Sequence, residues 1–372
     1  MNTAALGTAD SCLIIDLGAI TENWRYLDRL SAPSVMTAAM IKANGYGLGA
    51  DRVGMALAAA GCQRFFVASL DEAIAQRHIF DDEGYGNVPI TVLHGVHRGQ
   101  EAAFLEARAV PVLNDLEQIS RWRLFANKTG QRLSALIHFD TGMTRLGLDS
   151  AQTDWLIENP QALDGLDIAY VMSHLVSAEL ADDPMNTAQI ERFSEIKGYF
   201  PGVPSSLANS GGCFLGANFH FHMTRPGIAL YGIDPMGKGI SPLKPSLRWQ
   251  ARILQIRSAR AGERVGYNGT HLLDRESRIA TIGVGYADGY RRQLGGKATV
   301  RIGNSVAPVI GRVSMDSITV DVTDLSWDDR KCETADLIHT TYDLGRMASD
   351  ANTISYEIMT QLGTRPSRHY TI

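Results

Sequence analysis

The feature that most constrains the fold is an alternation of short apolar runs with amphipathic stretches between residues 34 and 235. Eight runs are bounded by turn residues or charges, as buried parallel strands are. They span residues 35–41, 65–69, 89–94, 110–113, 133–139, 168–173, 205–208 and 228–232. Helices are predicted at residues 71–79, 115–126 and 186–199. At about 25 residues per strand–helix unit, the pattern favours a (β/α)8 barrel. An open, doubly wound sheet is the alternative, because a strand count does not prove closure.

After Pro235 the pattern changes to strands with polar alternation, separated by turns rich in Gly and Asp. These strands are predicted at residues 246–257, 278–284, 298–302 and 317–322, with no long helical period before 351–362. We therefore expect an α/β chain with an N-terminal (β/α)8 TIM barrel over 11–240 and a mostly β C-terminal domain over 241–372. A first strand at about 12–17 precedes the barrel units and is expected to join the β domain.

The composition favours a globular protein that acts on a small molecule. Of the 372 residues, 45% are hydrophobic and 20% are charged with both signs mixed, which argues against disorder. The formal net charge of −5 and the lack of a long basic run argue against nucleic-acid or membrane-surface binding. The four cysteines are widely separated, which predicts no metal site. Residues 1–10 lack the features of a secretory signal, and no apolar segment approaches the roughly 20 residues of a bilayer span, so we expect a cytoplasmic location.

Reactive side chains come from five of the predicted strand–helix units, and we expect them at the barrel end where active sites form. Any one of them has an ordinary explanation, such as a lysine that pairs with a carboxylate, but their shared position favours a functional site. They are Lys42, Asp140 with Arg145, His174, Asn209 with Ser210, and Arg225, which directly precedes the run at 228–232.

Several of these residues suit a phosphorylated, covalently held cofactor. A lysine partly removed from water at a strand end loses its proton more easily and can form a Schiff base. Tyr46 lies in the Gly-rich turn after Lys42 and is positioned to reach a phosphate. The segments 210–212 and 225–228 offer hydroxyl and backbone N–H donors for a phosphate, although each could equally be a plain turn.

The motifs resemble those of fold-type III pyridoxal-phosphate (PLP) enzymes, and the alanine racemase family most closely. The resemblance runs from IKANGYG, which begins at Ile41, through FDTGMTRLG, TRPGIALYG, RVGYNGT and RVSMDS to YEIMTQLGTRPSR at the C-terminal end. It implies a barrel followed by a β domain, in a head-to-tail homodimer with shared active sites. It also implies interconversion of L-alanine and D-alanine, for peptidoglycan or for alanine catabolism.

The resemblance assigns a role to each motif. Lys42 would hold PLP and act as the base on one face of the substrate, and Tyr267 of the partner subunit would be the opposing base. Arg225 would face the pyridine nitrogen, and Arg145 the phenolic oxygen of PLP and the substrate. His174 would stack near the ring and hydrogen-bond Arg225. The remaining cofactor contacts would be Tyr46, Asn209, Ser210, Gly227, Ile228 and Tyr356. The partner subunit's Met315 and the partner subunit's Asp316 would line the substrate carboxylate and the entrance.

These assignments have chemical consequences. Lowering the pKa of a tyrosine by about 2–3 units, so that it can act as a base, corresponds to about 3–4 kcal/mol, which cations such as His174 and Arg225 could supply. Because arginine keeps its proton, Arg225 should leave the pyridine nitrogen unprotonated and limit transamination. The chain departs from many members at His138, where they carry a carbamylated lysine. Arg145 must then be oriented in another way, by a bound anion or by another carboxylate.

Three other readings are weighed against this one. A PLP racemase of serine or of broader specificity is the main alternative, but Tyr356 matches the bulky phenol of alanine enzymes. Fold-type III decarboxylases place an acidic residue opposite the pyridine nitrogen, where this chain has Arg225. Single-barrel PLP-carrier proteins lack the β domain that would hold Tyr267, Met315 and Asp316.

Overall fold

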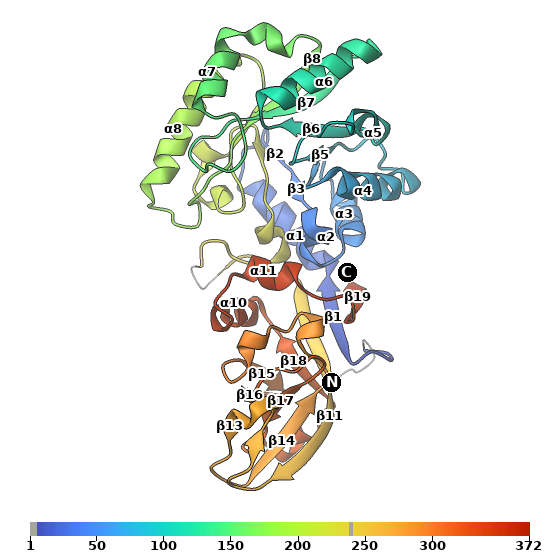
Figure 1. Ribbon diagram of the computed structural model, residues 1–372, viewed down its shortest axis with the longest axis vertical. Helices are drawn as coiled ribbons and strands as arrows, with labels where there is room; N and C mark the ends of the chain where they lie inside the picture. Colours follow the sequence, from blue (N-terminus) through green and yellow to red (C-terminus); the bar gives the residue numbers. More distant parts are fainter. Residues whose placement is uncertain (1–5, 238–240) are drawn as a thin grey trace. The chain divides into compact units, whose positions relative to one another are not determined.

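The computed structural model describes residues 6–237 and 241–372, which form two compact units (Figure 1). One unit is Ile20–Lys244, and the other combines Met1–Ala19, as far as it is described, with Pro245–Ile372. The domain boundary that we expected between residues 240 and 241 lies next to residues 238–240, which are outside the described residues. Among the residues described, no helix combines the length and the hydropathy that a membrane crossing needs.

The Ile20–Lys244 unit is a closed barrel of parallel strands. Seven strands pair in sequence order: β3 (Ala39–Met40), β4 (Phe65–Val67), β5 (Ile90–Val92), β6 (Ala109–Leu113), β7 (Leu133–His138), β8 (Leu166–Met172) and β9 (Ser205–Ser206). The eighth position is β10 (Met223–Thr224), which pairs with β2 (Met36–Thr37), one residue before β3. The N–H groups of His222 and Arg225 donate to carbonyls of Ser205 and Ala208, both at 2.9 Å, and join β10 to the β9 segment. The predicted barrel is therefore confirmed, and the open sheet is excluded.

Helices connect these strands and lie outside them (Figure 1). They are α1 (Leu17–Arg29), α3 (Ala50–Ala59), α4 (Leu70–Asp82), α5 (Glu101–Glu106), α6 (Leu116–Thr129), α7 (Ser150–Glu158) and α8 (Pro184–Gly198). Side-chain caps fix several starts: Ser69 and Glu72 form a capping box at α4, and Asp115 accepts the Gln118 N–H at α6. The predicted helices at 71–79, 115–126 and 186–199 match α4, α6 and α8 to within a few residues.

The expected eighth strand at 228–232 is wrong. Ile228–Tyr231 is a 3-10 helix, and the strand is the shorter β10 before it. A short run of buried apolar residues does not separate a buried strand from a buried helical turn. Pro226 also has no N–H with which to continue the ladder, so the strand ends at this point. Arg225 thus follows the eighth strand instead of preceding it.

The β domain is built around a ring of six antiparallel strands. Their pairing order is β14–β17–β16–β15–β18–β11, and β11 returns to β14. The strands are β11 (Leu247–Ala259), β14 (Ser277–Ile282), β15 (Thr299–Ile302), β16 (Ser305–Ile310), β17 (Ile318–Asp321) and β18 (Thr334–Ile338). Register shifts within β11 let its first half pair with β18 and its second half with β14. The expected mostly β C-terminal domain is confirmed.

Both ends of the chain contribute to this domain. The segment expected at 12–17 appears as β1 (Ser11–Asp16), which is antiparallel to β11 and parallel to β19 (Ser367–Thr371). A small hairpin, β12 (Arg264–Val265) with β13 (His271–Leu272), carries the loop around Tyr267.

The helix expected at 351–362 is wrong in its bounds. Two helices occupy the region, α10 (Thr341–Asp350) and α11 (Ser355–Thr360), and α9 (Trp327–Arg330) is a single turn. Asn352 between the two helices has a φ of 54°, a left-handed conformation that ends a right-handed helix.

Candidate active site

Lys42 is separated from the end of β3 by Ile41 and begins a left-handed turn, α2 (Lys42–Tyr46). The φ angles of Ala43, Asn44, Gly45 and Tyr46 are 52°, 54°, 61° and 56°. Left-handed backbone costs residues other than glycine about 1–2 kcal/mol each, so the turn persists only where its surroundings hold it. The turn has backbone hydrogen bonds of its own, from the Gly45 N–H to the Ile41 carbonyl and from the Gly47 N–H to the Ala43 carbonyl, both at 2.8 Å, and contacts outside the turn help to hold it.

A carboxylate from the next barrel unit supplies such contacts. Glu72 accepts the N–H of Ala43 on one oxygen, at 2.6 Å, and the N–H of Ala68 on the other, at 2.7 Å. The same side chain completes the capping box of α4. Asn44 closes the far end of the turn by accepting the Ala50 N–H at 3.0 Å.

The surroundings of Lys42 favour its neutral amine. Burial lowers the pKa of Lys42, the Arg145 guanidinium lowers it further, and the Glu72 carboxylate partly opposes this. A larger neutral fraction makes the amine a better nucleophile and a better base near neutral pH.

Arg225 is a buried cation at the same end of the barrel, with 1% of its surface exposed. Its guanidinium donates to the Ser206 hydroxyl and to carbonyls of Ser173, at 2.6 Å, and Leu207, at 3.4 Å. Burial lowers the pKa of Arg225 to about 10, which still leaves it charged at neutral pH. Within the described part of the chain its Nε has no hydrogen-bond partner, and it forms no ion pair with a carboxylate. A buried positive charge thus keeps one donor available.

His174 differs from the expectation in two respects. Its hydrogen bond to Arg225 is not among the contacts of that guanidinium. Burial and the neighbouring Arg225 and Arg145 hold the pKa of His174 well below its usual value, so the imidazole is neutral. The expectation that His174 supplies positive charge is therefore wrong, and the two arginines are the cations at this rim.

His138 is neutral as well, because burial and Arg225 lower its pKa to about 3. Its Nδ1 lies 2.9 Å from Oδ1 of Asn114, whose amide N–H groups donate to carbonyls of Leu93 and Val112. The amide oxygen must therefore be the acceptor, which places the imidazole proton on Nδ1 and a lone pair on Nε2.

The loop that carries Arg145 is held by its backbone. Asp140 accepts the N–H groups of Gly142, Met143 and Thr144 at 2.8–2.9 Å. The Arg145 side chain itself is exposed and forms no ion pair within the described residues. Asp140 thus fixes the backbone before Arg145, not the guanidinium.

A group of polar atoms that could hold a phosphate lies where the loops after β9 and β10 meet. The Ser210 hydroxyl accepts the N–H groups of Gly227, at 2.8 Å, and Ala229, at 3.3 Å. A Cβ on Gly227 would lie 2.2 Å from the phenol oxygen of Tyr46. Position 227 therefore has to be glycine, so that the Tyr46 hydroxyl, the Ser210 hydroxyl and backbone N–H groups can gather at one place.

Two other residues predicted to contact the cofactor, Asn209 and Ile228, lie near this group and contribute to the local structure. Asn209 donates to the Leu175 carbonyl at 3.1 Å and accepts the Gly212 N–H at 3.0 Å, which braces the loop. Ile228 is fully buried at the start of its 3-10 helix.

Four predicted site residues belong to the β domain, not to the barrel. Tyr267 begins a 3-10 turn and is 67% exposed, Met315 is 52% exposed, and Tyr356 is part of α11. Asp316 accepts a hydrogen bond from Arg365 at 2.6 Å, and Arg365 also donates twice to Asp288, at 2.8 and 2.7 Å.

Three residues of these networks were missed as site residues: Glu72, Asp288 and Arg365. The S-x-x-E spacing of Ser69 and Glu72 indicates a capping box and could have drawn attention to Glu72. Nothing in the local sequence pairs Arg365 with Asp288, 77 residues earlier.

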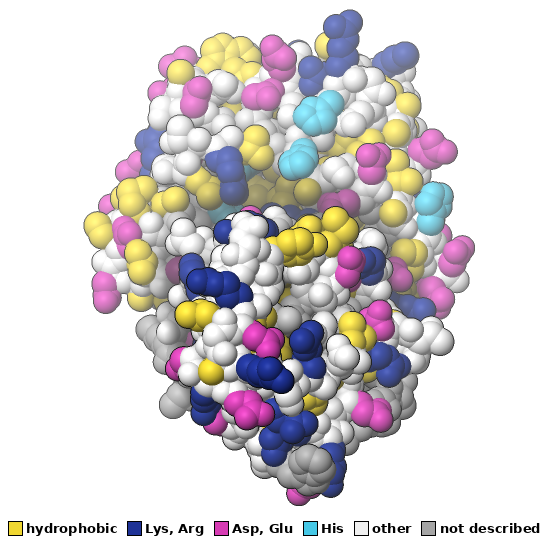
Figure 2. Space-filling model, turned by 60° about the horizontal axis from the view of Figure 1, so that its bottom comes forward, with side chains coloured by type: hydrophobic (Ala, Val, Ile, Leu, Met, Phe, Trp, Pro, Cys, Tyr) yellow, Lys and Arg dark blue, Asp and Glu magenta, His cyan; other side chains and the backbone are white. Residues whose placement is uncertain are grey.

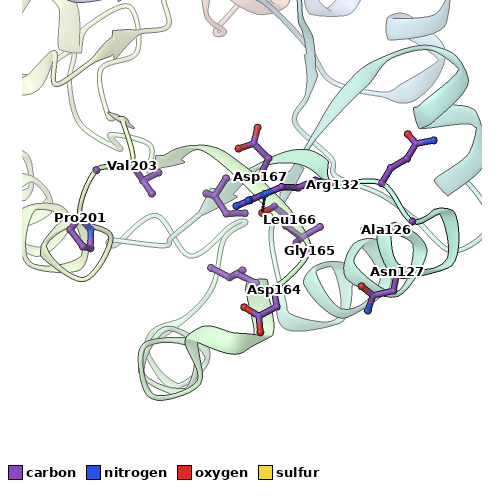
Figure 3. Close-up of a pocket in the computed structure, with 14 residues that line it drawn as sticks. Ala126, Asn127, Arg132, Asp164, Gly165, Leu166, Asp167, Pro201 and Val203 are labelled. Carbon is purple, nitrogen blue, oxygen red and sulfur yellow. Dashed lines mark hydrogen bonds between the residues drawn. The ribbon is translucent and has the colours of Figure 1, made fainter.

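A groove at the opposite, amino-terminal end of β7 and β8 contains none of the predicted site residues (Figure 3). Arg132 in this groove donates to the Leu166 carbonyl at 3.1 Å, a contact that connects the two strands. On the face shown in Figure 2, basic and acidic side chains are interspersed.

Comparison with known proteins identifies both units. Residues 15–235 match the alanine racemase N-terminal domain, and residues 246–370 match the alanine racemase C-terminal domain. The alanine racemase of Acidiphilium cryptum is 45% identical over 96% of this chain and 97% of its own length. A protein of Agrobacterium fabrum named "Alanine racemase, catabolic" is 42% identical over 98% of this chain and 93% of its own length.

A solved structure has the same fold along nearly the whole chain. Alanine racemase from Bartonella henselae, with covalently bound pyridoxal phosphate, superposes with a TM-score of 0.93 at 40% identity. The match covers 98% of this chain and all of that chain. With both domain models matched and relatives similar over nearly its full length, the chain belongs to the alanine racemase family.

Proposed function

We propose that this protein interconverts L-alanine and D-alanine with pyridoxal 5′-phosphate as its cofactor. The observation that carries the proposal is Lys42, an amine with a lowered pKa, at a barrel end that also holds the buried cation Arg225. The names of the similar proteins agree with this reaction.

The residues at the barrel end fit this cofactor. The Tyr46 and Ser210 hydroxyls would hold the phosphate beside Gly227, in a space that a side chain at position 227 would fill. The available donor of Arg225 suits an unprotonated ring nitrogen, and Arg145 suits an anionic oxygen. When bound, PLP supplies an electron-withdrawing ring that makes the Cα proton of the attached amino acid acidic.

Racemisation needs a proton acceptor on each face of the substrate. The Lys42 amine takes or returns the proton on one face, and Tyr267 of the partner subunit does so on the other. Arg225 and Arg145 are the cations that stabilise negative charge at this end of the barrel, since His174 is neutral. The alternating roles of the two bases allow the reaction to run in both directions.

A head-to-tail homodimer follows from this division of roles. Tyr267 and Met315 are large side chains with most of their surface exposed on the β domain, which supports their contact with a second copy. Activity should then depend on assembly, because each site uses residues of two chains.

The test is a panel of L-amino acids, scored for D-product with PLP added. We expect alanine to be the fastest substrate, and serine or lysine exceeding alanine would overturn the substrate assignment in favour of a broader racemase. Lys42→Ala should abolish both D-alanine formation and the visible absorbance of the linked cofactor. Retained absorbance would remove Lys42 from its role.

A further inference from the structure

The carboxylate of Glu72 connects the ends of two neighbouring barrel strands. One of its oxygens accepts the N–H of Ala43, directly after Lys42, at 2.6 Å. The other accepts the N–H of Ala68, directly after β4, at 2.7 Å. A single half-buried side chain therefore ties the backbone next to Lys42 to the adjacent βα unit.

The backbone segment that Glu72 contacts has a left-handed conformation, which is unfavourable for residues other than glycine. Ala43, Asn44 and Tyr46 have left-handed φ angles although they carry a Cβ. If the contact to Ala43 were lost, this residue would relax towards the right-handed region, and Lys42 before it would change direction. Ala43 is exposed, so its side chain makes no buried contact that could replace the hydrogen bond.

We propose that Glu72 is a positioning residue, which keeps the left-handed turn in place so that the Lys42 amine points to the cofactor and substrate. The proposal rests on the proposed function only for the reaction that Lys42 performs. Glu72 also balances Arg145, the positive group that acts on Lys42, because the Glu72 charge raises the pKa of Lys42.

The test compares Glu72→Gln with a matched control. The amide can still accept one N–H, but its NH2 group would face the other, so one of the two contacts is lost. Asp115→Asn is the control, because Asp115 is also a half-buried acidic cap, accepting the Gln118 N–H at 2.7 Å at the start of α6.

Two measurements separate positioning from helix stability in the PLP-loaded proteins. Borohydride reduction followed by mass mapping gives the fraction of Lys42 that carries cofactor as the PLP concentration is raised. Steady-state kinetics give kcat and KM for alanine. For Glu72→Gln we expect kcat to fall about 10- to 100-fold with KM little changed, and half-labelling of Lys42 to need about tenfold more PLP. Asp115→Asn should change neither quantity, even where its melting temperature falls equally.

Ala43→Gly provides a rescue that a helix cap alone would not show. Glycine adopts the left-handed conformation without a Cβ penalty, so Glu72→Gln with Ala43→Gly should recover part of the labelling and of kcat. Glu72→Asp, which is too short to reach both N–H groups, takes the place of Glu72→Gln if that variant does not fold.

Wild-type labelling and kcat in the Glu72 variant would overturn the proposal, and so would a failed rescue by Ala43→Gly. If the wild-type protein forms no D-alanine while labelling of Lys42 still depends on Glu72, the substrate assignment fails and the positioning role stands.

Discussion

Replacing Gly227 by alanine adds a single carbon atom next to Tyr46 and so tests whether the phosphate of PLP is held by Tyr46 and Ser210. The new Cβ would lie 2.2 Å from the phenol oxygen of Tyr46, 2.9 Å from its ring carbon Cζ and 3.4 Å from Cβ of Met40. The phenol must therefore move by about 1 Å to restore ordinary contact. Tyr46 is buried, and its ring centroid lies 4.8 Å from that of Tyr231, which limits the directions open to it.

This displacement should lower both the stability of the protein and its affinity for PLP. Overpacking of a buried site costs about 1–3 kcal/mol, which lowers the melting temperature of a unit this large by about 2–12 °C. Losing one hydrogen bond to a charged phosphate costs about 1.5–3 kcal/mol, which weakens PLP binding roughly 10- to 100-fold.

A titration of the cofactor-free variant with PLP, followed by visible absorbance, measures the binding effect. Gly198→Ala is the control, because a Cβ at that position meets nothing within 4 Å and its φ is not left-handed. Adding Tyr46→Phe to Gly227→Ala removes the closest clashing atom, so stability should partly return while PLP binding stays weak. An unchanged Kd for PLP in Gly227→Ala would refute the placement of the phosphate at this group.

Three further predictions address the charged groups. Arg225→Glu should increase transamination relative to racemisation, measured as pyruvate formed per D-alanine, and an unchanged ratio in a folded variant would contradict the role of Arg225. Arg365→Ala leaves the buried Asp288 with the Gly285 N–H but without its ion-pair partner, and should lower the free energy of unfolding by about 1–3 kcal/mol in denaturant titrations, whereas Arg365→Lys should lose less. Because the pKa of folded His138 is lowered to about 3, the unfolded chain binds more protons between pH 3 and about 6.5, so stability falls as the pH drops through this window, by about 1.4 kcal/mol per unit. Unfolding at pH 7.5 and 5.5 should show a smaller loss for His138→Gln, and equal losses in the two proteins would contradict this account.

The barrel was predictable because most of its strands are separate apolar runs with charged or turn residues on either side. The error at 228–232 arose where burial is complete, since the periodicity of a short apolar segment is then lost. The strands β16, β18 and β19 were not predicted because none of them shows a clear alternation of polar and apolar residues. β16 contains Pro308, a residue that is unusual inside strands, every residue of β18 is buried, and β19 consists mostly of polar side chains.

The candidate site was predictable as a set of residue types at strand ends, but its electrostatics were not. The neutrality of His174 depends on burial and on Arg225 and Arg145, which belong to other units of the barrel. The bracing of Lys42 by Glu72 likewise needs the neighbouring strand, because the two residues are joined only after the barrel forms. The charge of His174 and the position of Lys42 depend on contacts between residues that are far apart in the sequence, and a linear motif does not contain these contacts.

The pairing of β1 with β19 determines the order in which the two units can be completed during synthesis. Ser367 near the end of the chain bonds to Ser11, 356 positions before it. All residues of the barrel unit have been synthesised once Lys244 is added, whereas β1 of the β domain lacks its partner on one side until β19 has been synthesised. A nascent chain can therefore complete its barrel unit well before β19 is available to the β domain, and removing residues 367–372 would expose an edge of β1 while leaving the sequence of the barrel unit intact.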